Sequence, residues 1–424
     1  MNTSSAKDLS LPPMLRVFMA VSALMGCLAL VVEWVCARWP GLNRVPYNCM
    51  TLGKDLDYVD FDMFRERFDH FHTASFFDKA WGSDFLYPAP DALIYRFFHF
   101  FPNDTNFFLS FVSLSFVCLT GWLYWELRRR GIRKASAAGF AIISLVFSYP
   151  AFFEFNRANV EMVVWGLTAG GVLLFVKNRP WLAAICLGLA GACKGYPYFY
   201  LGLFLVRKRY WETAASVALG GAVTAASFWL EAANFTVGRT ETAAGVDLFR
   251  QFYVLRRRAN EIGLDHSVFG LIKRFWESLP APDRLQHYLT AYMVIAALLA
   301  CAVFFFRVRK LPLINQVIFV TVTCITLPPT SYDYTLLHLY TPWLMVLFLI
   351  MRVWQEHGTT PKELWPVVIC FTVLLSTQSE MIWRGERIEG QLKCLFLLLL
   401  AGLAAWRPMT PKMDVTDDHQ EATA

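Results

Sequence analysis

One carboxylate shortly after the first apolar stretch has the type and position needed for acid–base chemistry at a membrane surface. It is Asp60, the first residue of the segment DFDMF at positions 60–64. Partial burial raises the pKa of a carboxyl group toward neutrality, where it can accept the proton of an acceptor hydroxyl. A solvated loop acid is the plainer interpretation. We predict Asp60 as the general base, with Asp57 and Asp55 as alternatives.

A single lysine ends an otherwise apolar segment on the side away from the basic turns described below. It is Lys194, and the Gly195-Tyr196-Pro197 segment that follows it interrupts a helix. That position runs against the usual preference of lysine for cytoplasmic turns. An ammonium group between two short helices is suited to bind a phosphate, with Tyr196 beside it. The alternative is a lysine whose side chain reaches back to the interface.

Further polar side chains occupy the segment NRANVE at positions 156–161, between two apolar stretches. Ionisable groups at membrane depth are unfavourable by several kcal/mol unless they are paired or face a cavity. Arg157 and Glu161 either pair at a spacing of four or, with Asn159, bind a substrate. Tyr87 begins a segment with two prolines, at positions 87–90, which forms a rigid turn or the wall of a pocket.

The segment LPPTSYDY at positions 327–334 is a short turn between two apolar stretches. Asp333 is placed either to cap the following helix or to hydrogen-bond a sugar. His338 follows on that helix, where a histidine is more often a core residue than a catalyst. His266 lies beside Asp265 in a second polar segment. We count Asp333, His338 and His266 among the candidate substrate-binding residues.

The elements that position these residues must be membrane helices. Of 424 residues, 56% are apolar and only 17% are charged, which is far from the composition of soluble proteins. Apolar stretches of the length that crosses a bilayer recur along the chain. They predict an all-α integral membrane protein with about twelve spans. The spans are expected at 14–35, 107–126, 135–153, 160–176, 181–194, 197–206, 211–230, 287–306, 312–329, 335–351, 364–378 and 392–406.

Lysine and arginine mark the cytoplasmic turns, because such residues in short loops favour that side. They cluster near residues 128–134, 177–179, 207–209 and 307–310. This predicts both termini in the cytoplasm and two long extracytoplasmic segments, 37–106 and 231–286, built of short interfacial helices. We expect one polytopic domain over residues 1–410 in the plasma membrane, followed by a disordered cytoplasmic tail at 411–424.

The sequence patterns that would indicate several other classes of function are missing. The basic residues sit in turns and not along one face, so nucleic acid is not an expected partner. No cysteine or histidine spacing typical of a metal site occurs, and no phosphate-binding or dinucleotide-binding motif is present. We expect neither a metal nor a cofactor.

In the order of these segments, the chain resembles the family 87 glycosyltransferases, a branch of the GT-C superfamily. The resemblance is carried, in chain order, by residues 60–64, 87–90, 158–161, 194–197 and 327–334. The Lys-x-Tyr-Pro motif of the family is matched at Lys194 to Pro197. The chain departs from the family pattern at Met63 and Phe64, at Ala158 where glycine is usual, and at Tyr332 and Tyr334 where tryptophan and histidine are common.

The resemblance implies a GT-C-type helical bundle and a hexosyltransferase. Its donor would be a polyprenyl-phosphate sugar, such as polyprenyl-phosphate mannose, and its acceptor a membrane-associated lipid or glycan on the extracytoplasmic face. Asp60 would be the base, and Lys194, with Arg157 or an arginine of residues 256–258, would neutralise the leaving phosphate. The competing hypothesis is a transporter or flippase for a lipid-linked or anionic substrate, because broken helices also mark transport pathways.

Overall fold

The computed structural model describes residues 9–38, 59–62, 64–78, 85–256, 262–275, 282–377, 382–383 and 386–409. Within them the regular structure is helical apart from one pair of two-residue strands and one isolated bridge. The α helices are α1 (Pro13–Arg38), α2 (Val59–Asp62), α3 (Ala89–His99), α4 (Asp104–Arg129), α5 (Lys134–Ala141), α6 (Tyr149–Arg157), α7 (Glu161–Val176), α8 (Pro180–Cys193), α9 (Leu201–Val206), α10 (Tyr210–Ala232), α11 (Phe235–Phe249), α12 (Val268–Phe275), α13 (Pro282–Phe306), α14 (Leu313–Thr326), α15 (Tyr340–His357), α16 (Trp365–Leu375) and α17 (Glu389–Trp406).

Shorter elements join these helices. The 3₁₀ turns are η2 (Arg65–His70), η3 (Ala74–Phe77), η6 (Tyr196–Tyr200), η8 (Ile262–Leu264), η9 (Val308–Lys310), η10 (Asp333–Leu339) and η11 (Lys362–Leu364). Two π-helical turns are η5 (Ile142–Val146) and η7 (Arg250–Val254), and the antiparallel strands are β1 (Ile382–Trp383) and β2 (Glu386–Arg387). The predicted all-α membrane fold is therefore found, with short helices in the described parts of both long polar segments.

The predicted number of twelve complete spans is not confirmed. Among the described residues, six helical stretches are long and apolar enough to cross a membrane: Pro13–Val32, Asp104–Arg129, Tyr210–Ala232, Arg284–Lys310, Asp333–His357 and Glu389–Trp406. A seventh results if Lys134–Val146 and Tyr149–Arg157, which are bent by 48°, form one broken span. Four more predicted spans fall on shorter apolar helices, α7, α8, η6 with α9, and α14.

Several of the apolar helices pack closely against one another. Helix α8 packs against both α7 and α10, and α14 packs against α17. At Gly188 the approach of α8 to α10 is so close that a Cβ atom would lie 2.6 Å from the carbonyl oxygen of Ser216. Only a residue without a side chain fits there. Short helices can therefore lie deep in the bundle.

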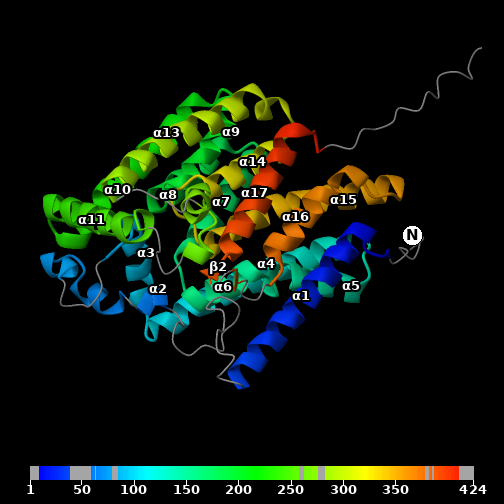
Figure 1. Ribbon diagram of the computed structural model, residues 1–424, viewed down its shortest axis with the longest axis horizontal. Helices are drawn as coiled ribbons and strands as arrows, with labels where there is room; N and C mark the ends of the chain where they lie inside the picture. Colours follow the sequence, from blue (N-terminus) through cyan, green and yellow to red (C-terminus); the bar gives the residue numbers. More distant parts are fainter. Residues whose placement is uncertain are drawn as a thin grey trace, which may run out of the picture.

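Two of the basic turns lie beside the described ends of the chain. The Leu9 amide donates to the Gly131 carbonyl, 2.8 Å away, and the Arg307 guanidinium donates to the Ala405 carbonyl near the end of α17. In Figure 1 the N-terminal end of α1 lies with α5 and α15 at one end of the long axis, and α2, α3 and α11 lie toward the other. The helices thus separate a basic end from the end that carries the candidate site.

Candidate active site

Asp60 lies on the single turn of α2, which aromatic side chains hold against the bundle. Phe61 is fully buried and packs against the rings of Tyr95 and Phe108, with centroid distances of 5.5 and 5.6 Å. Phe64 packs edge-on against Tyr87, 5.5 Å away. Burying two such rings favours one position for the turn by several kcal/mol. Asp60, only 7% exposed, is thereby fixed at the start of the site.

Asn159 connects Asp60 to the next elements. Helix α6 ends with Ala158 in the left-handed conformation, at φ 50°, which turns the chain toward α7. The Asn159 side-chain oxygen accepts a hydrogen bond from the Glu161 amide at the start of α7, at 3.0 Å. Its amide nitrogen donates to the Asp60 carboxylate at 2.8 Å and to the Tyr87 hydroxyl at 3.1 Å. One buried asparagine therefore holds the carboxylate and the tyrosine together.

Lys194 lies over the ring of Tyr87. Its ammonium is 4.5 Å from the centre of the Tyr87 ring and 5.7 Å from that of Tyr334, positions in which a cation is attracted to the ring face. Its side chain is 13% exposed, and its nitrogen is 3.5 Å from the carboxylate of the fully buried Asp91. The helix break at Gly195 leaves the lysine at the end of α8. Asp60, through the Asn159 amide, and Lys194, through the ring face, are thus both linked to Tyr87.

Glu161, at the start of α7, connects that helix to η6 and η10. One of its oxygens accepts a hydrogen bond from the Tyr196 hydroxyl and contacts the His338 Nε2 at 2.8 Å. Glu161 and His338 are buried, and the Tyr196 ring lies edge-on to the imidazole. Arg157 and Glu161 do not lie one turn apart on one helix, as the pairing alternative required, because α6 ends at Arg157 and α7 begins at Glu161. Arg157 lies over the Phe153 ring, 5.7 Å from its centre.

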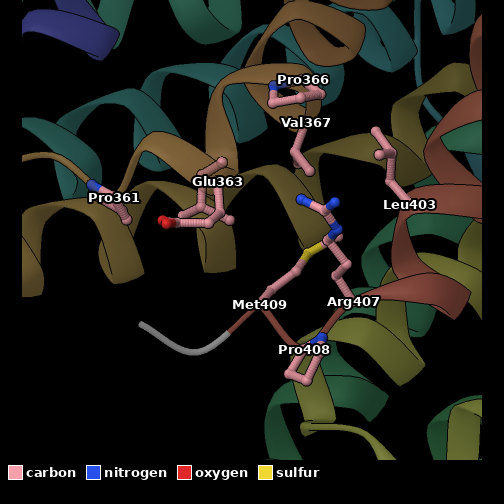
Figure 2. Close-up of a pocket in the computed structure, with 9 residues that line it drawn as sticks. Pro361, Glu363, Pro366, Val367, Leu403, Arg407, Pro408 and Met409 are labelled. Carbon is pink, nitrogen blue, oxygen red and sulfur yellow. The ribbon is translucent and has the colours of Figure 1, made fainter. Parts of the chain in front are cut away.

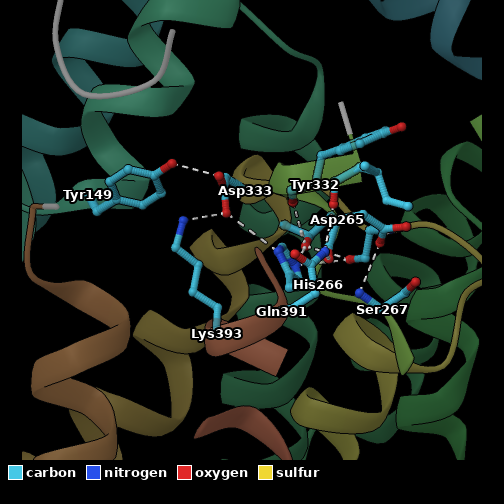
Figure 3. A network of polar contacts seen from close by, with 11 residues as sticks. Tyr149, Asp265, His266, Ser267, Tyr332, Asp333, Gln391 and Lys393 are labelled. Carbon is cyan, nitrogen blue, oxygen red and sulfur yellow. Dashed lines mark hydrogen bonds and ion pairs between the residues drawn. The ribbon is translucent and has the colours of Figure 1, made fainter. Parts of the chain in front are cut away.

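Asp333 and His266 belong to a second network, shown in Figure 3. The Asp333 carboxylate contacts the Lys393 ammonium at 2.7 Å, accepts from the Tyr149 hydroxyl at 2.6 Å, and lies 3.5 Å from the His266 Nδ1. All these groups are buried, and the Lys393 ammonium also lies 3.8 Å from the centre of the Tyr149 ring. The carboxylate is thus engaged by the protein itself, which favours a positioning role over contact with a sugar.

The polar turn before α12 completes this second network. The Asp265 carboxylate accepts the backbone amides of Ser267 and Ser331, at 2.9 and 3.0 Å, and burial raises the pKa of Asp265. The His266 Nε2 lies 3.0 Å from the Thr335 hydroxyl and 3.1 Å from that of Ser331. The network joins the segment before α12 to η10 and α17.

The structure therefore brings together most, but not all, of the predicted site residues. Asp60, Tyr87, Asn159, Glu161, Lys194, Tyr196 and His338 form one cluster, which we call the Asp60–Lys194 cluster. Asp333 and His266 adjoin it through η10, which carries Asp333 at one end and His338 at the other. The alternatives Asp55 and Asp57 lie outside the described residues, as do Arg257, Arg258 and the predicted tail at 411–424.

Two charged residues were missed by the sequence analysis, Asp91 and Lys393. Lys393 stands near the start of the last apolar span, far along the chain from the basic turns, and the argument used for Lys194 would have singled it out. Asp91 follows the two prolines of the Tyr87 turn, and no sequence signal links it to Lys194. Among the described residues no group of three His, Cys, Asp or Glu side chains is placed to hold a metal ion.

A pocket at the opposite end of the helices does not compete with this cluster. It is lined by Pro361, Glu363, Leu364, Pro366, Val367, Leu403, Arg407, Pro408 and Met409, most of which Figure 2 labels. Its volume is about 50 Å³, whereas sites for small molecules usually enclose roughly 300–1,000 Å³.

Comparison with known proteins gives one result. The model of glycosyltransferase family 87 matches residues 85–377, which is more than half of the chain. The match leaves Asp60 and Lys393 outside. It includes these other residues of the candidate site: Tyr87, Asn159, Glu161, Lys194, Tyr196, Asp333 and His338. A search of curated proteins finds no match.

Proposed function

The chain belongs to glycosyltransferase family 87, and on this premise we propose that it transfers a hexose, such as mannose, from a polyprenyl-phosphate donor to a lipid or glycan acceptor in the same membrane. The observation that carries the proposal is the shared tyrosine. Asp60 and the Tyr87 hydroxyl accept from the same Asn159 amide, and the Lys194 ammonium lies over the Tyr87 ring, so a carboxylate and a cation are both linked to this tyrosine. Glycosyl transfer from a phosphate donor needs both.

Asp60 is the proposed base. It would take the proton from the acceptor hydroxyl as that oxygen attacks the anomeric carbon. The Asn159 amide occupies one carboxylate oxygen, which orients the other. Direct attack breaks the bond between the anomeric carbon and the phosphate oxygen and inverts the anomeric centre.

Lys194 is the proposed partner of the leaving phosphate. As the glycosidic bond breaks, negative charge grows on the phosphate, and a fixed ammonium in a site of low dielectric stabilises this charge more than it would in water. Arg157 and Arg256 are further cations; Arg256 is exposed and lies over the Phe252 ring. We propose the extracytoplasmic face of the plasma membrane as the location, with the basic turns and both termini in the cytoplasm.

The transporter hypothesis is less well supported. Family membership favours an enzyme. Within the Asp60–Lys194 cluster, hydrogen bonds join Asp60 to Asn159, and Glu161 to Tyr196 and His338. The bend of 48° before Tyr149 is the feature that a transporter would share.

The decisive experiment offers purified protein labelled polyprenyl-phosphate sugars together with a panel of lipid and glycan acceptors. The Asp60→Asn variant should lower turnover by about 100- to 10,000-fold, since its amide keeps the contact to Asn159 but cannot accept the proton. The matched control is Asp62→Asn, because exposed Asp62 lies on the same turn and accepts only a hydrogen bond from Thr105 among the contacts described. Turnover of Asp60→Asn near the wild-type rate would exclude Asp60 as the base, and failure of every polyprenyl-phosphate donor would exclude this donor class.

A further inference from the structure

A buried carboxylate faces the proposed phosphate-binding lysine. Asp91 is fully buried, and neither of its oxygens has a hydrogen-bond partner among the described residues. The Lys194 ammonium is 3.5 Å from one of them, close enough for charge attraction but longer than a strong charge-assisted hydrogen bond. Asp91 and Lys194 therefore form an ion pair, but a long one.

The position of Asp91 in the first turn of α3 does not explain why its carboxylate is buried. An acidic residue in the first turn of a helix often accepts a backbone amide or interacts with the helix dipole. The Asp91 side chain makes no such hydrogen bond, and its own amide donates to the Pro88 carbonyl. A carboxylate buried in this way is unfavourable unless a cation compensates it. Lys194 is the described cation that does so.

Titratable groups around Asp91 come from several elements. Besides Lys194, they are Glu161 on α7, the Cys193 thiol on α8, Tyr95 on α3 itself and Glu231 on α10. Burial raises the pKa of Asp91 from 3.8 to about 7, and the Lys194 charge opposes this rise. If the ammonium moves away, the opposing contribution falls and the pKa rises further.

Lys194 is free to make that movement. Its side chain is the partly exposed member of the pair, and its other contacts are the faces of two tyrosine rings, which do not fix a direction as a hydrogen bond would. A donor phosphate would therefore compete with Asp91 for the same ammonium.

We propose that Asp91 is a positioning residue that holds Lys194 while the site is empty and, when the donor phosphate draws the ammonium away, takes up one proton from water. This inference rests on the proposed function, since it requires an anionic donor. The proton joins the Asp91 carboxylate and leaves a neutral acid in the protein interior. Donor binding and proton uptake are then linked, and affinity is greatest below the pKa of the free site.

Calorimetric titration with synthetic farnesyl-phosphoryl-mannose tests this linkage. The probe is a phosphodiester, so its own charge does not change near neutral pH. Titration at about pH 8 in two buffers of different ionisation enthalpy gives the number of protons bound, expected to be about one for the wild type and about zero for Asp91→Asn. Above about pH 7 the wild-type affinity should fall by roughly tenfold per pH unit, and that of Asp91→Asn should stay constant.

The control is Asp69→Asn, an exposed carboxylate that contacts His99 outside the cluster; it should keep the wild-type proton uptake and slope. Wild-type binding without proton uptake would overturn the role of Asp91, whether or not the variant folds. The same pH slope in Asp91→Asn would also overturn it and assign the titration to another group. No binding of the probe to the wild type would instead overturn the proposed donor, and with it this inference.

Discussion

Replacement of Lys393 by methionine tests the second network, because it removes the cation and keeps most of the side-chain volume. Asp333 would keep the Tyr149 hydroxyl at 2.6 Å and His266 at 3.5 Å, but its charge would remain buried without the ammonium that now lies 2.7 Å away. Both partners are at most 1% exposed, so water cannot replace the lysine without rearrangement. Removal of one partner of such a pair lowers the free energy of unfolding by about 3–5 kcal/mol.

Unfolding of the purified protein in mixed micelles of a mild detergent and dodecyl sulfate, followed by tryptophan fluorescence, measures this difference. A second variant, with Lys393→Met and Asp333→Asn together, should recover more than half of the loss, since the orphan charge is gone and the asparagine oxygen still accepts from Tyr149. The control is Arg352→Met, which breaks an exposed pair with Glu356 and should leave the unfolding curve unchanged. The reasoning fails if Lys393→Met unfolds like the wild type, or if the double variant is no more stable than the single one.

Two further outcomes follow from the Asp60–Lys194 cluster. Lys194→Met should lower kcat/KM for the donor by at least about 100-fold, because the charge on the leaving phosphate is no longer stabilised. The control Lys177→Met, in a basic turn, should leave kcat/KM unchanged. Equal effects in the two variants would contradict the role of Lys194. Burial raises the pKa of Asp91 from 3.8 to about 7, so the stability of the folded wild type falls as pH rises from about 4 to 7. Asp91→Asn lacks this titration and should gain stability relative to the wild type across that interval, as measured by thermal unfolding. A stability difference between the two proteins that stays constant with pH would contradict the shift.

The sequence was sufficient to predict the helical membrane fold, because apolar composition and the lengths of the stretches depend on local residues alone. The predicted number of about twelve complete spans is not confirmed. Hydropathy does not distinguish a helix that crosses the bilayer from a shorter one such as α14, which has 14 residues, or α16, which has 11. The predicted span 135–153 is interrupted by the π turn η5 and a bend before Pro150, and these depend on tertiary packing.

Within the candidate site, the sequence predicted which polar residues gather but not how they pair. Asn159 was named as a substrate ligand, yet in the structure both ends of its amide are engaged by Asp60, Tyr87 and the Glu161 backbone. Asp91 and Lys194 are more than a hundred positions apart in the chain, and only the packing of α3 against α8 brings them together. Pairings of this kind follow from the fold and have no local pattern.

The shortness of α8 has a consequence for the depth at which chemistry would occur. The helix begins at Pro180, directly after a basic turn, and has 14 residues, which rise about 21 Å. The hydrocarbon core is about 30 Å thick. With the proposed topology, we expect an ammonium at the end of α8 to lie inside the hydrocarbon core, below the level of the far headgroups. A phosphate already attached to a lipid reaches it by a short descent from the headgroup layer, whereas a water-soluble sugar nucleotide would have to leave water altogether. The length of one helix thus favours a substrate that arrives from the side, through the membrane.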